Sequence, residues 1–197
     1  MKKKWIMALA MALMVLFSAM AADPWYYNLE MAEFSFSGLH NIPESKITDA
    51  LYVYRYKPFT DETYAELETK LYAIEGVDFF IAVPEEIDDK GFRIAFEFYE
   101  IPMIWSIAYE GNDAIKTREL REAVTAFSVG SFIDPMNTAS FDAAKEQIRS
   151  VYTAKGFLDV PIEYEIEENT ENNTYKVTFY IKEGEQTRIT KIGRAHV

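Results

Sequence analysis

The chain has 197 residues, no cysteine and a formal net charge of -12 at pH 7. The absence of thiols excludes a disulfide framework, a thiolate metal site and a cysteine nucleophile. The acidic excess argues against nucleic acid partners and against direct contact with anionic lipid headgroups. A hydrophobic content of 49%, with 15% aromatic residues, indicates well-packed cores.

The first 22 residues have the pattern of a secretory signal peptide. Three lysines at positions 2–4 precede an apolar run over 5–17, and Ala19 and Ala21 form an A-x-A cleavage site. An uncleaved anchor is the alternative, because residues 5–22 approach the roughly 18 apolar residues of a spanning helix. No later segment is long and apolar enough to span a bilayer as a helix, so we expect the rest of the chain outside the cytoplasm.

Two stretches, 38–47 and 111–120, align without a gap and indicate an internal repeat. Superposing Gly38 on Gly111 pairs apolar residues at the spacing of one helix face: Ile42 with Ile115, Ile47 with Leu120, Ala50 with Ala123, and Leu51 with Val124. Each of these glycines is predicted to end a strand and open a helix.

The periodicity predicts the same elements in the same order in both copies. The first copy has strand 30–37, a helix after Gly38, helix 60–74, strand 77–83 and strand 92–98. The second has strand 104–110, a helix after Gly111, helix 137–155, strand 157–166 and strand 175–181. Thr60 is a predicted helix cap, and Gly76 and Gly156 are predicted to end the second helices. Pro161 cannot donate to a ladder, so we expect its strand at a sheet edge.

Each copy therefore reads βααββ and is predicted to be an α+β unit, a three-stranded mixed sheet covered on one face by two helices. We assign the repeats to 23–101 and 102–184. Residues 185–197 resemble the start of a third copy, and 191–197 look like the translation of a common sequencing adapter. We therefore expect a fragment with a spurious end.

The repeated unit resembles the POTRA domains of BamA-family outer-membrane protein assembly factors, over about residues 25–190. The resemblance rests on the order of short motifs behind a signal peptide: Gly38-Leu39, Gly111-Asn112, Tyr152-x-x-Lys155-Gly156-Phe157 and Glu183-Gly184-Glu185. The first copy departs from the pattern at Leu39, where the second has Asn112, so its membership rests mainly on topology.

The resemblance implies a periplasmic arm, at the outer membrane of a diderm bacterium, without enzymatic activity or a cofactor. Such an arm would bind unfolded outer-membrane protein precursors and accessory assembly lipoproteins, while a C-terminal barrel, absent here, inserts the clients. A similar arm of a two-partner secretion or translocation-and-assembly transporter is the first alternative. A cell-division protein with one such unit and a periplasmic envelope hydrolase are less well supported.

Strand addition at an exposed sheet edge would suit such clients, because main-chain hydrogen bonds need little sequence preference. The candidate edges are 77–83 and 157–166, and the candidate client-binding residues are Phe157, Val160, Ile162, Tyr164, Phe79 and Ile81. The alternative is that one edge packs on the adjacent repeat.

The sequence contains no convincing catalytic or metal-binding pattern. The only histidines are His40, expected in a loop, and His196 in the tail. Carboxylates at Glu85, Glu86, Asp88 and Asp89 lack the spacing of a calcium loop and are predicted to form a solvated turn. Glu163, Glu165 and Glu167 share one strand face and predict a solvated surface.

Overall fold

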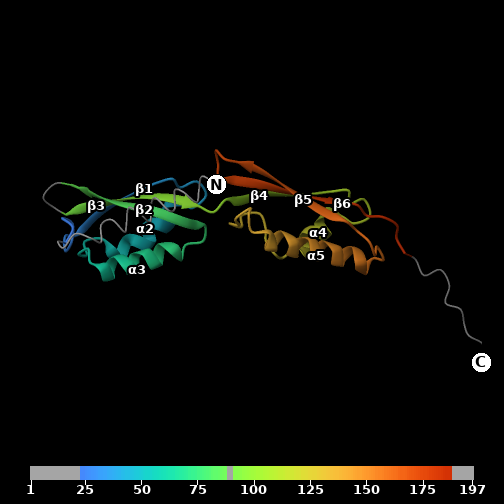
Figure 1. Cartoon of the computed structure of the whole chain (residues 1–197), viewed down its shortest axis with the longest axis horizontal. Coiled ribbons are helices and arrows are strands. Elements are labelled where there is room, and N and C mark those ends of the chain that lie inside the picture. Colours follow the sequence, from blue (N-terminus) through green and yellow to red (C-terminus); the bar gives the residue numbers. More distant parts are fainter. Residues whose placement is uncertain (1–22, 88–90, 188–197) are drawn as a thin grey trace, which may run out of the picture. The chain divides into compact units, whose positions relative to one another are not determined.

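The computed structural model describes residues 23–87 and 91–187. The chain divides into two units, Met1–Glu100 and Ile101–Val197. In each unit, two helices lie on one face of a three-stranded sheet (Figure 1). The predicted α+β class with two βααββ units is confirmed. The predicted signal peptide and the last ten residues lie outside the described part of the chain.

Within residues 23–87 and 91–100, the first unit contains three strands and two α-helices, with a short 3-10 helix between the helices. Its elements are β1 (Met31–Ser37), α2 (Glu44–Leu51), η1 (Tyr52–Tyr54), α3 (Asp61–Tyr72), β2 (Val77–Glu86) and β3 (Phe92–Glu100). The strand order is β1-β3-β2, in which β1 is parallel and β2 antiparallel to β3. The last strand is therefore central, and β1 and β2 are edges.

The second unit repeats this arrangement. Its elements are β4 (Met103–Glu110), α4 (Thr117–Ala123), α5 (Thr138–Ala154), β5 (Ile162–Asn169) and β6 (Thr174–Ile181). The order is β4-β6-β5, again with a parallel and an antiparallel pair around the last strand. As expected for the strand that follows Pro161, β5 lies at an edge.

Local sequence features account for several boundaries. The Thr60 side chain accepts a hydrogen bond from the Thr63 amide, and the Thr63 side chain accepts one from the Thr60 amide, so a capping box starts α3. Gly111 ends β4 with φ +78°, and an added Cβ would lie 2.1 Å from the Ile181 carbonyl oxygen. Gly38 makes the same close approach to Phe98 in the first unit. Glycine is required at both positions because a side chain would collide with the central strand.

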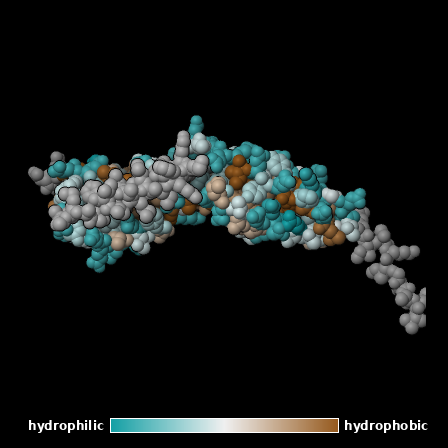
Figure 2. All heavy atoms as spheres, viewed as in Figure 1, coloured by the Kyte–Doolittle hydropathy of each residue, from teal (hydrophilic) through white to brown (hydrophobic). Residues whose placement is uncertain are grey.

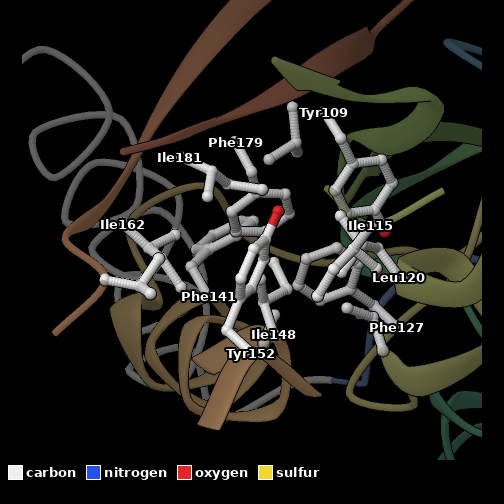
Figure 3. Close-up of a cluster of buried hydrophobic side chains, with 14 of the residues drawn as sticks. Tyr109, Ile115, Leu120, Phe127, Phe141, Ile148, Tyr152, Ile162, Phe179 and Ile181 are labelled. Carbon is white, nitrogen blue, oxygen red and sulfur yellow. The ribbon is translucent and has the colours of Figure 1, made fainter. Parts of the chain in front are cut away.

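Hydrophilic side chains cover much of the surface seen in Figure 2, and the apolar side chains gather between helices and sheet. In the second unit, Phe141, Ile148 and Tyr152 of α5 point toward Phe179 and Ile181 of β6 (Figure 3). Together with α4 these residues form one continuous core. In the first unit, the buried residues include Ile47 and Leu51 of α2, Leu67 and Leu71 of α3, and the phenylalanines of β3.

The largest difference from the predicted boundaries concerns β5, which begins at Ile162 instead of Phe157. The Lys182 amide donates to the Pro161 carbonyl oxygen at 3.1 Å, and Pro161 has no amide hydrogen to return. The segment before it follows another path, in which the Thr187 amide donates to the Gly156 carbonyl oxygen at 2.9 Å. The ladder therefore stops at the proline.

Candidate functional site: the open edges of the two sheets

The candidate residues near β5 contribute side chains to the core of the second unit. Phe157, Val160 and Ile162 are buried, and the first two precede the strand. Tyr164 is half-buried, and its ring centroid lies 5.0 Å from that of Phe141. A client at this edge would therefore meet the backbone of β5, because most of these side chains already have their packing partners inside the unit.

The candidate residues on β2 lie on the helix-free face of the first sheet. Phe79 and Ile81 are half-buried, and Val83 on the same face is 50% exposed. The ring of Phe79 stacks on that of Tyr99 with centroids 4.2 Å apart. This face of β2 is therefore an apolar strip next to the edge of the sheet.

In each unit the connection between the two helices covers the edge of the first strand. The Met31 amide donates to the Lys57 carbonyl oxygen (3.0 Å), and the Tyr56 amide donates to that of Met31 (2.9 Å). The equivalent bonds in the second unit run from Ile104 to Ser131 (2.9 Å) and from Gly130 to Ile104 (2.8 Å). Within residues 23–87 and 91–187, no such backbone bond reaches the outer edge of β2 or β5. The hairpin strands are thus the open edges.

The hydrogen-bond register shows which groups of β5 point away from the sheet. The Lys182 amide faces β5, and so do the alternate residues of β6 that precede it. Opposite those residues stand Glu163, Glu165 and Glu167, which bond to β6 through their backbones. The N–H and C=O groups of the intervening residues, Ile162, Tyr164, Ile166 and Glu168, therefore point outward.

The open edge of β2 is shorter. The Phe92 amide donates to the Glu30 carbonyl oxygen at 3.1 Å, so Phe92 and the alternate residues after it face β1. Their opposite residues on β2, which include Phe80, Ala82 and Pro84, turn their backbones outward. Pro84 has no N–H group, so the row of outward donors is interrupted after Ala82.

The two faces beside the β5 edge differ in polarity. On the helix side, Tyr164 and Ile166 are half-buried against the core. The opposite face carries Glu163, Glu165 and Glu167, all exposed. The Tyr180 hydroxyl donates to Glu165 (3.0 Å), and the Lys176 ammonium lies 3.3 Å from Glu167. An added strand would therefore have an apolar neighbour on one face and an acidic neighbour on the other.

In the part of the chain that the structure describes, no group of histidine, aspartate and glutamate side chains is arranged to hold a metal ion. The same residues include no helix long and apolar enough to cross a membrane. His40 is exposed in a loop, whereas His196, Asp88 and Asp89 lie outside the described residues. Glu85 belongs to β2, and its Oε2 atom lies 3.5 Å from Nη1 of Arg93.

Comparison with known proteins identifies the second unit. Residues 102–184 match the POTRA family model, described as the surface antigen variable number repeat. The second unit is a POTRA domain. The first unit lies outside the matched range and has the same topology as this POTRA domain.

A candidate outer membrane protein assembly factor of Treponema pallidum (strain Nichols) is 28% identical over 176 residues. The match covers 88% of this chain and 20% of that protein, so this chain spans about a fifth of the length of the relative. The predicted resemblance to the POTRA repeats of outer-membrane protein assembly factors is confirmed by this match and by the family model.

Several solved structures are also similar. The N-terminal domain of Omp85 from Thermosynechococcus elongatus has a TM-score of 0.44 and 18% identity, covering 85% of this chain and 73% of that one. BamA POTRA3-5 from Haemophilus influenzae has a TM-score of 0.38 and 11% identity, covering 85% and 71%. CdiB from Escherichia coli has a TM-score of 0.35 and 16% identity, covering 83% and 28%.

The POTRA domain and the first unit share a carboxylate anchor that the sequence pattern did not reveal. Both Glu183 oxygens accept from the Ala114 amide, at 2.8 and 2.9 Å, and the Tyr152 hydroxyl donates to one of them at 2.8 Å. In the first unit, Glu100 accepts from the amides of His40 (2.9 Å), Asn41 (2.8 Å) and Ile42 (3.0 Å). Each glutamate lies two residues after the strand residue that its glycine approaches, so the two anchors occupy equivalent positions in the two units.

Proposed function

We propose that this chain forms part of the periplasmic arm of an outer-membrane protein assembly factor. In this role the units hold unfolded outer-membrane protein precursors by adding a client strand to the open edge of β5. The role is binding without catalysis. Accessory assembly lipoproteins, and a membrane barrel belonging to the same protein, are the further partners that we propose.

The observation that carries the proposal is the uninterrupted open edge of β5. Four successive outward residues, Ile162, Tyr164, Ile166 and Glu168, offer both N–H and C=O groups. β4, at the other side of the sheet, already has a partner in the loop around Gly130 and Ser131. A client in extended conformation can satisfy these groups whatever its side chains, as a receptor for many precursors requires.

The polarity of the two faces at β5 supports a particular class of client. Strands of outer-membrane barrels alternate between apolar and polar residues with a period of two. Added to β5, such a strand would place its apolar side chains beside Tyr164 and Ile166 and its polar side chains beside the glutamate row. Basic residues on the polar face would be favoured because Glu163, Glu165 and Glu167 are exposed carboxylates.

The register defines the test. Proline at Ile166 removes an outward N–H, whereas proline at Glu165 would remove a bond to β6. We expect Ile166→Pro to weaken binding of a fluorescent peptide from an outer-membrane barrel strand by about tenfold, measured by anisotropy. Ile166→Thr, which keeps the N–H group, is the matched control and should bind as the parent does.

Ile166 is half-buried, so Glu168→Pro provides a second block at an exposed side chain with an outward N–H. Circular dichroism would verify that both proline variants are folded. Unchanged peptide binding by the two folded proline variants would contradict strand addition at β5. An arm of a two-partner secretion or translocation-and-assembly transporter would use the same edge, and the number of POTRA repeats in the intact gene would separate the two systems.

A further inference from the structure

The loop that caps β1 carries an unusual group of exposed apolar side chains. Tyr52 is 74% exposed, Val53 57% and Tyr56 58%. They follow one another around η1, and the Arg55 amide in the same turn donates to the Tyr52 carbonyl oxygen at 3.3 Å. We call Tyr52, Val53, Arg55 and Tyr56 the Tyr56 surface. It lies on the loop beside β1, away from the open edge of β2.

The backbone conformation of Tyr56 is unfavourable for its residue type. Its φ is +64°, in the left-handed region that disfavours residues with a Cβ atom. The equivalent residue of the second unit, which donates the same bond to its first strand, is Gly130 with φ +92°. The fold therefore accepts glycine at this position. Because the Tyr56 side chain is mostly exposed, its contribution to packing does not explain the choice of tyrosine.

The tyrosine ring instead holds an arginine. The Arg55 guanidinium carbon lies 5.0 Å from the centre of the Tyr56 ring, within range of a cation–π interaction. Arg55 Nε donates to the Ala32 carbonyl oxygen at 3.0 Å. The guanidinium is thus fixed at Nε and on one face, which leaves its two terminal nitrogens as parallel donors. That geometry matches the two oxygens of a carboxylate.

Local charge favours an anionic partner. Neither Arg55 nor Lys57 forms an ion pair within the described residues, although the whole chain has 32 acidic and 20 basic residues. No acidic residue occurs between Ala50 and Thr60. An extended anionic membrane would face repulsion from the rest of this acidic chain, whereas a short protein segment need approach only the loop.

We propose that the Tyr56 surface is a docking site for a partner protein segment that presents a carboxylate beside an aromatic or aliphatic side chain. The carboxylate pairs with the terminal nitrogens of Arg55, and the apolar side chain packs on the tyrosine rings. This site is separate from the β5 edge. A proline that blocks β5 would leave it intact, so the two proposals can fail independently.

The test uses the full chain and a peptide in which two glutamates flank a phenylalanine, with a glutamine-containing version as its control. We expect backbone NMR signals of residues 52–57 to shift with the glutamate peptide, and much less with the glutamine peptide. Arg55→Gln should weaken binding by about tenfold. Tyr56→Gly should weaken it similarly while leaving the unit as stable as the parent or more so. Arg118→Gln, an exposed arginine of the second unit, should have no effect.

Three results would overturn the proposal. One is the absence of shifts at residues 52–57, and another is equal affinity for the glutamate and glutamine peptides. The third is a response only to vesicles of phosphatidylglycerol, which would indicate a lipid surface instead of a protein segment. Unfolding of the unit by Tyr56→Gly would also overturn the proposal, because the tyrosine would then have a structural role.

Discussion

The two units have the same strand order, the same loop over the first strand and the same glutamate anchor, yet they present different edges. β5 offers an uninterrupted row of outward backbone groups beside a glutamate row, whereas Pro84 interrupts β2 beside an apolar strip. The loop over the first strand has a tyrosine with positive φ at the position where the other unit has a glycine. The features that are repeated are those the fold requires, and the features that differ are the candidates for binding.

The largest expected effect concerns a repeated feature. Gly111→Ala should destabilise the second unit by at least about 4 kcal/mol, because the new Cβ would lie 2.1 Å from a carbonyl oxygen of the central strand. Gly130→Ala in the same unit meets no atom within 4 Å and should cost only about 1 kcal/mol. Urea unfolding followed by hydrogen exchange in each unit measures both, and similar losses for the two variants would contradict the steric argument.

The glutamate anchors should differ in strength between the units. Glu100 is 7% exposed and satisfies three amides, so Glu100→Ala should cost about 2–3 kcal/mol. Glu183 is half-buried and satisfies one amide and a hydroxyl, so Glu183→Ala should cost about 1 kcal/mol. The same unfolding measurement applies. A larger loss of unfolding free energy for Glu183→Ala than for Glu100→Ala would show that burial of the carboxylate does not determine the loss.

Alkaline pH should lower the stability of the second unit gradually. Burial, and then the hydrogen bond to Glu183, raise the pKa of Tyr152 above its ordinary value, and burial raises the pKa of Tyr175. The folded state therefore keeps these protons longer than the unfolded chain does. The stability that these two hydroxyl groups contribute should be fully present below about pH 10. Above that pH the free energy of unfolding should fall by up to about 1.4 kcal/mol per pH unit for each group. Tyr152→Phe should reduce the slope in the second unit, and an unchanged slope would exclude this hydroxyl as a cause.

The fold could be predicted from the sequence because period-two strands, period-3.6 helices and glycine boundaries occur in the same order twice. The edge position of β5 could be predicted because Pro161 cannot donate to a ladder. The beginning of β5 was predicted too early because Val160 continues the alternation of Ile162, although the ladder ends at Pro161. Apolar alternation reports burial, and burial continues through residues that have already left the strand.

The candidate site was less predictable. Alternation identified the strands that carry Phe79, Ile81, Ile162 and Tyr164, but it cannot tell which backbone groups point outward. That information required the register between β5 and β6. The anchors at Glu100 and Glu183 depend on hydrogen bonds between residues that are 58–60 and 69 positions apart in the sequence. No local sequence pattern contains this information.

The parallel pairing of β1 with β3 constrains the order in which a unit can fold. Glu33 pairs with Arg93, 60 residues later, so the sheet cannot close until the last strand of the unit is available. Contacts of such long range slow folding and leave the earlier segments unprotected while the chain emerges. In the second unit, β4 likewise cannot pair until β6 is available. A chain crossing a membrane from its N-terminus would therefore fold in steps of one whole unit, and the first unit could be complete while the second was still an unpaired strand.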